Sequence, residues 1–154
     1  MSRTDRASRL IAAPPAKLYA AFVDPAALVR WLPPEGMTGE IQEFDARPGG
    51  GYVMTLTHDA PDPAVPGKSS EHGDRVAARF IELVPGKRIV QQAEFDSEDP
   101  AFAGTMTLTW TLEAADGSTR VEIVCRDVPA GIGKRDHIAG LKSSLANLAR
   151  FVEG

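Results

Sequence analysis

Apolar and polar residues alternate along most of the segment from Thr105 to Cys125. In its first half, threonines separate the large apolar residues Met106, Leu108, Trp110 and Leu112. A period of two is typical of a β-strand with one buried face and one face toward water. The pair Asp116-Gly117 then predicts a tight turn, because Asp-Gly between two alternating runs favours a hairpin. The segment therefore predicts an antiparallel hairpin with one apolar face.

Five further strands are predicted from shorter stretches with a similar pattern. They lie near residues 6–11, 38–44, 52–56, 75–84 and 88–95. The turn sequence RPGGG separates the second from the third, and Pro85-Gly86 suits the centre of a type II turn between the last two. The polar segment from His58 to Asp74 has no apolar periodicity, so we expect a long loop there.

Helical spacing marks three other segments. Pro14-Pro15 starts the first helix, because proline suits the first helical turn. Asp24 is the expected N-cap of the second helix, which Pro33-Pro34 ends. The third helix runs from about Lys134 to Val152. Its apolar residues recur every three or four positions and form one stripe: Ile138, Leu141, Leu145, Leu148 and Val152.

The predicted order of elements is βααββββββα, in an α+β fold with one domain that spans residues 1–154. A mostly antiparallel sheet whose strands share one apolar face must curve around another element. The long last helix is the element available to fill that curve, and the two short helices would close one end.

A curved sheet that holds one helix need not fill its whole interior. Gaps between such elements are typical sites for small ligands, with volumes of about 300–1,000 Å³. The residues expected to line this cavity are Trp31, Met37, Phe44, Tyr52, Met54, Phe80, Phe95, Met106, Trp110, Leu141 and Leu145. The alternative is that these residues only pack against one another as an ordinary core.

Composition narrows the classes of function. The 154 residues carry a formal net charge of −4, and Lys and Arg are interleaved with Asp and Glu, which argues against a nucleic-acid surface. Charges at the N-terminus argue against a signal peptide, and no apolar run approaches the length of a membrane span, so we expect a cytoplasmic protein. Cys125 is the only cysteine, and its inward strand position predicts a small buried hydrophobic residue.

Several motifs resemble the SRPBCC (START-like) superfamily. They are the proline-started helix, the pattern DP-x5-W-x-P from Asp24 to Pro33, the turn F-D-x-R-P-G-G at Phe44 to Gly50, and the PGKRI turn at Pro85 to Ile89. The resemblance extends from about Arg6 to Phe151. More narrowly, the chain resembles bacterial homologues of the C-terminal domain of the heat-shock protein 90 ATPase activator.

This resemblance implies the helix-grip fold, which is also that of birch-pollen-allergen-like proteins, with a deep hydrophobic cavity between the sheet and the C-terminal helix. It implies no particular reaction, because START-like relatives include carriers, receptors, cyclases and hydroxylase subunits. Relatives often carry Gly-Trp near the start of the last helix, where this chain has Gly140-Leu141. A smaller residue there would widen or reshape the mouth of the pocket.

Candidate chemical groups are few. His58, Asp59, Glu71, His72 and Asp74 flank the predicted long loop, but their spacing matches no known pattern of metal ligands, so we assign no metal site.

A general acid or base would need a titratable group inside the apolar pocket, and Glu94 and His72 are the candidates near an expected inward face. We assign neither a catalytic role, and no cofactor is implied. Five polar residues of the last helix are expected to be solvated: Arg135, His137, Lys142, Asn147 and Arg150.

Three functional hypotheses follow. The first is the binding of a small hydrophobic or amphipathic molecule in the cavity. The second is a stress-related or chaperone-associated interaction module that uses the outer surface. The third is a small cyclase- or hydrolase-type enzyme with Glu94 or His72 as the proton carrier. Exposed edges of the sheet would also allow two copies of the chain to pair as a homodimer, but they do not require it.

Overall fold

The computed structural model describes residues 3–33, 36–58, 73–95, 100–102 and 104–153. In chain order, its elements are β1 (Thr4–Ile11), α1 (Pro15–Phe22), α2 (Pro25–Trp31), β2 (Met37–Gln42), β3 (Gly51–His58), β4 (Gly73–Val84), β5 (Arg88–Phe95), the short 3₁₀ helix η1 (Pro100–Phe102), β6 (Met106–Ala115), β7 (Ser118–Arg126) and α3 (Lys134–Glu153). Apart from the added η1, this order confirms the predicted arrangement.

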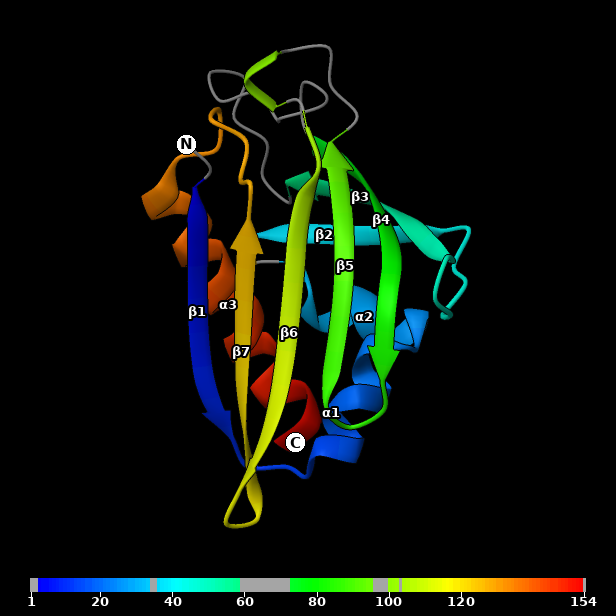
Figure 1. Cartoon of the computed structure of the whole chain (residues 1–154), viewed down its shortest axis with the longest axis vertical. Helices are drawn as coiled ribbons and strands as arrows, with labels where there is room; N and C mark the ends of the chain where they lie inside the picture. The colour runs from blue at the N-terminus through cyan, green and yellow to red at the C-terminus, as the bar shows by residue number, and fades with distance from the viewer. Residues whose placement is uncertain (1–2, 34–35, 59–72, 96–99, 103, 154) are drawn as a thin grey trace.

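The seven strands form one antiparallel sheet in the order β1-β7-β6-β5-β4-β3-β2 (Figure 1). The predicted hairpin joins β6 to β7, and both residues of its turn have positive φ angles, 47° at Asp116 and 83° at Gly117. A two-residue turn with two positive φ angles matches the twist of the strands that it connects. At one edge of the sheet, β1 pairs with β7, so segments far apart in the sequence lie side by side: Thr4 lies opposite Arg126.

Local signals explain the two short helices. Pro15 and Pro25 occupy the first turns of α1 and α2, and the Asp24 carboxylate accepts a hydrogen bond of 3.0 Å from the backbone N–H of Ala26. The indole N–H of Trp31 donates to the carbonyl oxygen of Ala21 at 2.9 Å, which ties α2 to α1. Together, the two helices lie at the end of the sheet where the β4–β5 turn lies (Figure 1).

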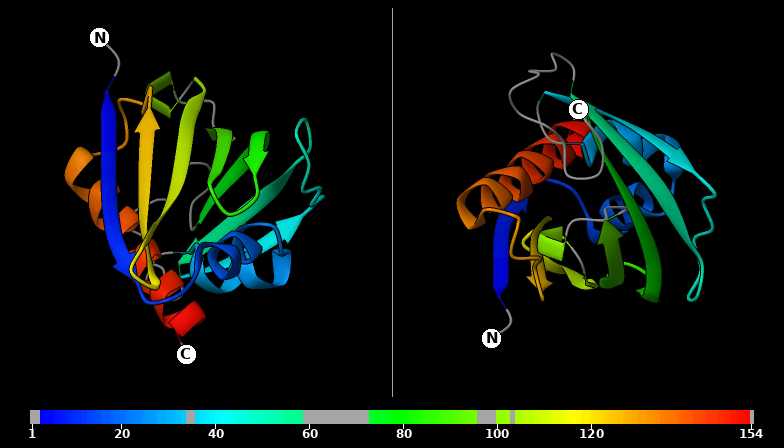
Figure 2. Two further views of the ribbon diagram at one scale, coloured as in Figure 1. Left: turned by 60° about the horizontal axis from the view of Figure 1, so that its bottom comes forward. Right: turned by 90° about the horizontal axis from the view of Figure 1, so that it is seen from above.

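The long helix α3 lies across the concave side of the sheet (Figure 2). Its apolar stripe is buried, with Leu145 and Leu148 at most 1% exposed. The helix packs against β1 and α2. A curled antiparallel sheet around a C-terminal helix is the helix-grip fold, so the predicted fold class is confirmed. None of the described helices is both long enough and apolar enough to cross a membrane.

The differences from the sequence prediction include two strand starts and one irregularity in strand pairing. β1 begins at Thr4 rather than Arg6, so Asp5 belongs to the strand. β4 already begins at Gly73, inside the segment predicted to be a loop; residues 59–72 of that segment lie outside the described residues. The pairing of β4 with β5 shifts register between Phe80 and Glu82, so Ile81 forms a β-bulge. A bulge bends a strand and increases its twist, which suits the curvature of this sheet.

Candidate ligand site on the inner face of the sheet

At the helix-covered end, the interior is closely packed with aromatic rings. The rings of Phe22, Trp31 and Trp110 meet edge to face, with centroids 4.8, 4.9 and 5.6 Å apart. Edge-to-face contacts at these distances are favourable between aromatic side chains. Trp31 is 0% exposed, and its indole N–H is already bonded to Ala21. Trp31 and Trp110 therefore belong to the core at this end.

A second aromatic group lies on the strands farther from α3. Phe44 stacks on Tyr52 at a centroid distance of 5.7 Å, and both rings lie about 6 Å from the ring of Phe80. Tyr52 and Phe80 are buried, whereas Phe44 is only partly buried.

The predicted lining residues divide into two groups by burial. Eight of them are buried, namely Trp31, Tyr52, Met54, Phe80, Met106, Trp110, Leu141 and Leu145. The other three are partly buried, namely Met37, Phe44 and Phe95. The structure thus brings most of the predicted residues into one apolar interior.

Several inward-facing apolar residues in the half of the sheet away from α1 are only partly buried, although others there, such as Met106, are buried. Leu108 is only partly buried, although its neighbours on the same face of β6, Met106 and Trp110, are 5% and 2% exposed. Val76 on β4 and Phe95 on β5 are paired with each other at this end and are also partly buried. Inward-facing apolar residues that stay accessible indicate space beside them.

A chain of polar side chains crosses the buried part of this face. The indole N–H of Trp110 donates to Oε1 of Gln91 at 3.3 Å, and Nε2 of Gln91 donates to the hydroxyl of Tyr52 at 3.2 Å. Gln91 is 6% exposed and Tyr52 is 7% exposed. Burial raises the pKa of Tyr52 to about 12, although the hydrogen bond from Gln91 acts in the opposite direction. The Tyr52 hydroxyl is therefore neutral over the physiological pH range.

Sequence reasoning missed Gln91. One signal could have found it. In the segment RIVQQAEF, every second residue lies on the same face of the strand, and the face with Ile89, Ala93 and Phe95 is the more apolar one. Gln91 lies on that face. In the structure this is the inner face, since Ile89 and Ala93 are buried.

The same alternation places Glu94 on the outer face, so its expected inward position is wrong. Phe95 and Glu94 are neighbours in one strand, and their side chains must point to opposite faces. The Glu94 carboxylate is exposed and accepts a hydrogen bond of 2.6 Å from the hydroxyl of Thr105. It lines a shallow outer hollow of about 290 Å³ together with Arg79 and Gln92.

The residues that flank the predicted long loop, which were considered as metal ligands or acid–base groups, have no described side chains. Asp59, Glu71 and His72 are not among the described residues, and the side chains of His58 and Asp74 are not described either.

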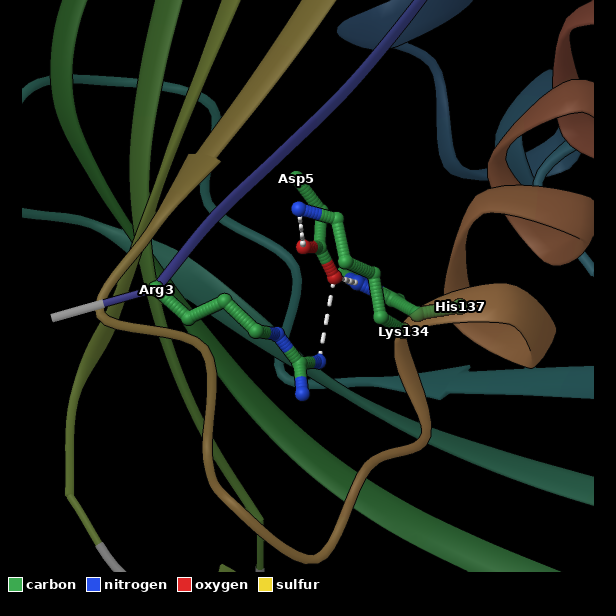
Figure 3. Close-up of polar contacts among 4 residues, drawn as sticks. All are labelled: Arg3, Asp5, Lys134 and His137. Atoms are coloured by element: carbon green, nitrogen blue, oxygen red, sulfur yellow. Dashed lines mark hydrogen bonds and ion pairs between the residues drawn. The ribbon is translucent and has the colours of Figure 1, made fainter.

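A buried ionic cluster joins β1 to the start of α3 (Figure 3). The Asp5 carboxylate is 0% exposed; its Oδ2 lies 2.7 Å from Nδ1 of His137 and 3.0 Å from Nη2 of Arg3, and its Oδ1 lies 3.9 Å from Nζ of Lys134. Burial raises the pKa of Asp5, but the hydrogen bonds from His137 and Arg3, with their positive charges, outweigh it and hold the pKa below 3.8. His137 is therefore not simply solvated, as the sequence suggested.

Cys125 lies opposite Asp5 in the pairing of β7 with β1. It is 0% exposed, and burial together with the negative charge of Asp5 raises the pKa of its thiol to about 12. A buried, protonated thiol is a poor nucleophile, so Cys125 acts as a small core residue, as predicted.

A second hollow, of about 360 Å³, lies on the outside between α2 and α3 and is lined by Arg30, Asn147, Arg150 and Phe151. Asn147 is not simply solvated, because its side-chain amide donates to the carbonyl oxygen of Pro33 at 2.9 Å and its oxygen accepts from Arg150. Neither hollow is lined by the residues predicted for the cavity.

The fold and the apolar inner face, with its buried polar chain, define a protein of the START-like class. Residues 12–153 match the model of the family described as Activator of Hsp90 ATPase homolog 1-like protein, and the chain belongs to this family. The resemblance inferred from its motifs is thereby confirmed.

Solved structures of bacterial proteins agree with this assignment. A Chromobacterium violaceum protein is 36% identical and superimposes with a TM-score of 0.85, over 98% of this chain and 97% of its own. An Arthrobacter aurescens protein (16% identity, TM-score 0.80, 97% and 86% covered) and a Rhizobium loti protein (23% identity, TM-score 0.73, 98% and 97% covered) share the fold. No curated protein matches the chain.

Proposed function

We propose that the chain binds a small, mostly apolar molecule between its sheet and α3. The observation that carries this proposal is the partial exposure of Leu108 on the inner face, between neighbours that are buried. Leu108 lies in the middle of the sheet, opposite Gln91 on one side and Cys125 on the other, yet it is more exposed than either. A fully packed core would bury a central inward-facing leucine.

The entrance would lie at the end of the sheet away from α1. Val76, Phe95 and Leu56 line this end and are all partly buried. Leu141 of α3 adds to the argument, because relatives often carry a larger tryptophan there and a leucine leaves more room. Of the eleven predicted lining residues, Trp31 and Trp110 would then belong to the packed floor, and the partly buried Met37 and Phe95 would lie at the mouth; the partly buried Phe44 follows the other end of β2 and stacks on Tyr52.

Substitution of Leu108 by Trp tests this proposal. The larger indole would occupy the free space, so we expect affinity for a neutral apolar dye such as Nile red to fall at least about tenfold, which corresponds to about 1.4 kcal/mol. The measurement is a fluorescence titration of the folded variant, with folding checked by urea denaturation.

The matched control is Thr109→Trp, which places the same side chain one residue further along β6 on the outer face. This variant should bind the dye like the original chain. Equal affinity in the folded Leu108→Trp variant would refute binding at the inner face.

Native mass spectra of protein purified from its own host give an independent test. A mass that is present in the native spectrum and lost on denaturation would identify a bound compound. A bare chain that also fails to take up the dye would argue for a closed core.

A second candidate function is that of a chaperone-associated interaction module, which the family membership favours. In that case the outer face of the sheet would make the contact, and the substitution Leu108→Trp would leave partner binding unchanged. Recovery of no stable partner from a native extract would count against this function. The position of Glu94 on the outer face argues against its role as the proton carrier of an enzyme in the inner cavity.

A further inference from the structure

The orientation of the Gln91 amide is fixed by its neighbours. The indole N–H of Trp110 can only donate a hydrogen bond, so the atom of Gln91 that faces it must be the carbonyl oxygen. The amide nitrogen then faces the hydroxyl oxygen of Tyr52, and the amide can only donate to it.

This orientation determines where the hydroxyl proton of Tyr52 points. Because the oxygen accepts from Gln91, its own proton cannot point toward the amide and is directed away from it. Among the described residues, Tyr52 has no other hydrogen bond. The hydroxyl is therefore a donor without an acceptor in a side chain that is only 7% exposed. A buried donor without a partner carries a penalty in free energy, and an acceptor that fills this position removes part of that penalty, because the acceptor gives up its own hydration.

The sheet gives the hydroxyl access to the interior. Tyr52 on β3 and Gln91 on β5 are separated by β4, where the residue opposite Tyr52 is the small Ala78. Ala78 is paired with Ala93 of β5, whereas Gln91 is paired with Phe80 of β4, so the tyrosine side chain crosses β4 diagonally to reach Gln91. Leu108, the partly buried residue beside the free space, lies directly opposite Gln91 on β6. The hydroxyl is thus close to the region where the proposed ligand would lie.

None of the interactions described for the Tyr52 hydroxyl involves a charged group. The described contacts of Tyr52 are the hydrogen bond from Gln91 and the rings of Phe44 and Phe80. Burial and that hydrogen bond account for its shifted pKa, with no contribution from a charged group. An anionic ligand group would be buried here without a cation, at a high cost in free energy.

We propose that the Tyr52 hydroxyl donates a hydrogen bond to an uncharged acceptor oxygen of the ligand, a carbonyl or an ether oxygen, and that Gln91 is the positioning residue that directs this proton. The inference rests on the proposed binding at the inner face. It narrows the ligand class to neutral, mostly apolar molecules with one acceptor oxygen, such as aryl ketones or esters.

A pair of probes of equal shape tests the inference. In 2-acetylnaphthalene a carbonyl oxygen stands where 2-isopropenylnaphthalene has a methylene group. The readout is the ratio of the two affinities in each variant, because the ketone loses more hydration than the hydrocarbon on burial and this difference is the same in all variants. In Tyr52→Phe, which keeps the ring and removes the hydroxyl, affinity for the ketone should fall about 3- to 10-fold, the range of one neutral hydrogen bond, while affinity for the hydrocarbon stays unchanged.

Two further variants complete the design. Tyr19→Phe is the matched control, because Tyr19 is the other tyrosine of the chain and is not part of the hydrogen bonds that link Trp110, Gln91 and Tyr52; it should bind both probes like the original protein. Gln91→Met keeps the length of the side chain and removes the amide, so the ratio of ketone affinity to hydrocarbon affinity should fall.

A measurement that needs no variant is the infrared carbonyl stretch of a ¹³C-labelled ketone, which should shift to lower wavenumber when the ketone is bound. An unshifted stretch, or the same ratio of the two affinities in the original chain and in Tyr52→Phe, would overturn the inference and leave binding at the inner face intact. If neither probe binds, the proposed function fails and the inference fails with it.

Discussion

Asp5 is the one charged side chain among the described residues that is fully buried. A buried carboxylate is tolerated when cations and hydrogen bonds compensate for lost hydration. Here the compensation comes from Arg3, directly before β1, and from Lys134 and His137 on α3. Even so, Oδ1 of Asp5 and Nε of Arg3 have no hydrogen-bond partner among the described residues. The cluster fixes the start of α3 on β1 through one carboxylate.

The lowered pKa of Asp5 predicts the pH dependence of stability. In the unfolded chain its pKa returns to about the ordinary value of 3.8, which is above the folded value. The carboxylate therefore stabilises the fold fully above about pH 5, and this contribution disappears as the pH falls through the folded pKa.

Asp5→Asn should lower the free energy of unfolding at pH 7 by about 1.5–3 kcal/mol, the range for hydrogen bonds to a charged group. The difference from the original chain should shrink below pH 4, as measured by urea denaturation at several pH values. Glu113→Gln, at an exposed position of β6, is the control and should change stability little. A difference that stays constant from pH 7 to pH 3 would contradict the role of the charge.

Individual polar residues were the hardest part to predict from the sequence. Gln91 and Gln92 are identical neighbours, and the sequence gives no reason to single out the buried one except the phase of the strand. Asp5 lay before the predicted start of the first strand, and its partner His137 is 132 positions away, so neither residue marks the other in the sequence. Contacts of this kind depend on the completed sheet.

At the scale of elements, α2 is held at its C-terminus by side chains of α3. The hydroxyl of Ser144 donates to the carbonyl oxygen of Leu32 at 2.6 Å, and the amide of Asn147 donates to that of Pro33 at 2.9 Å. The last carbonyls of a helix have no partner within the helix, so these two bonds act as a cap from another element. They couple the short helix, and with it the packed floor of the interior, to α3.

Removing these caps should loosen α2. We expect Ser144→Ala and Asn147→Ala each to lower the free energy of unfolding by about 0.5–1.5 kcal/mol, the value of a neutral hydrogen bond. Lys142→Ala, at an exposed position of the same helix, is the control. Hydrogen exchange of the α2 amides should also accelerate in the two cap variants. Unchanged exchange in both would show that α2 is held by its apolar contacts alone.

The elements themselves were largely predictable. Alternation along β6, the Asp-Gly turn, Asp24 before Pro25, and the apolar stripe of α3 are local signals, and the structure contains each of the elements they predict. The start of β4 at Gly73 was missed, because its first residues are polar and pair with β3 rather than follow a local pattern. The burial of most of the predicted lining residues was also foreseen. Which inward-facing residues stay partly exposed was not, because their exposure depends on which parts of the sheet the helices cover.

At the scale of the whole molecule, Cys125 reports on the integrity of the sheet. Its thiol lies beneath the pairing of β1 with β7 and is 0% exposed. An alkylating reagent can reach it only when β1 separates or the core opens. We expect iodoacetamide to modify native Cys125 at least about a hundredfold more slowly than the denatured chain, as a mass-spectrometric time course would measure.

The variant Asp5→Asn should accelerate this labelling, because it weakens the link between β1 and α3. Glu113→Gln again serves as the control. Native labelling at the rate of the denatured chain would mean that the core around the thiol is open in solution.

The pairing of β1 with β7 also has a consequence for the synthesis of the chain. A ribosome adds about 5–20 residues per second, so β1 waits roughly 6–24 s for the strand that pairs with it. Through that interval Ala7 and Ile11, which end up in the core, have no permanent neighbours on the nascent chain. Contacts between such distant segments also slow folding. The time at which the core closes is therefore set by the last third of the message, whatever the speed at which the first strand is made.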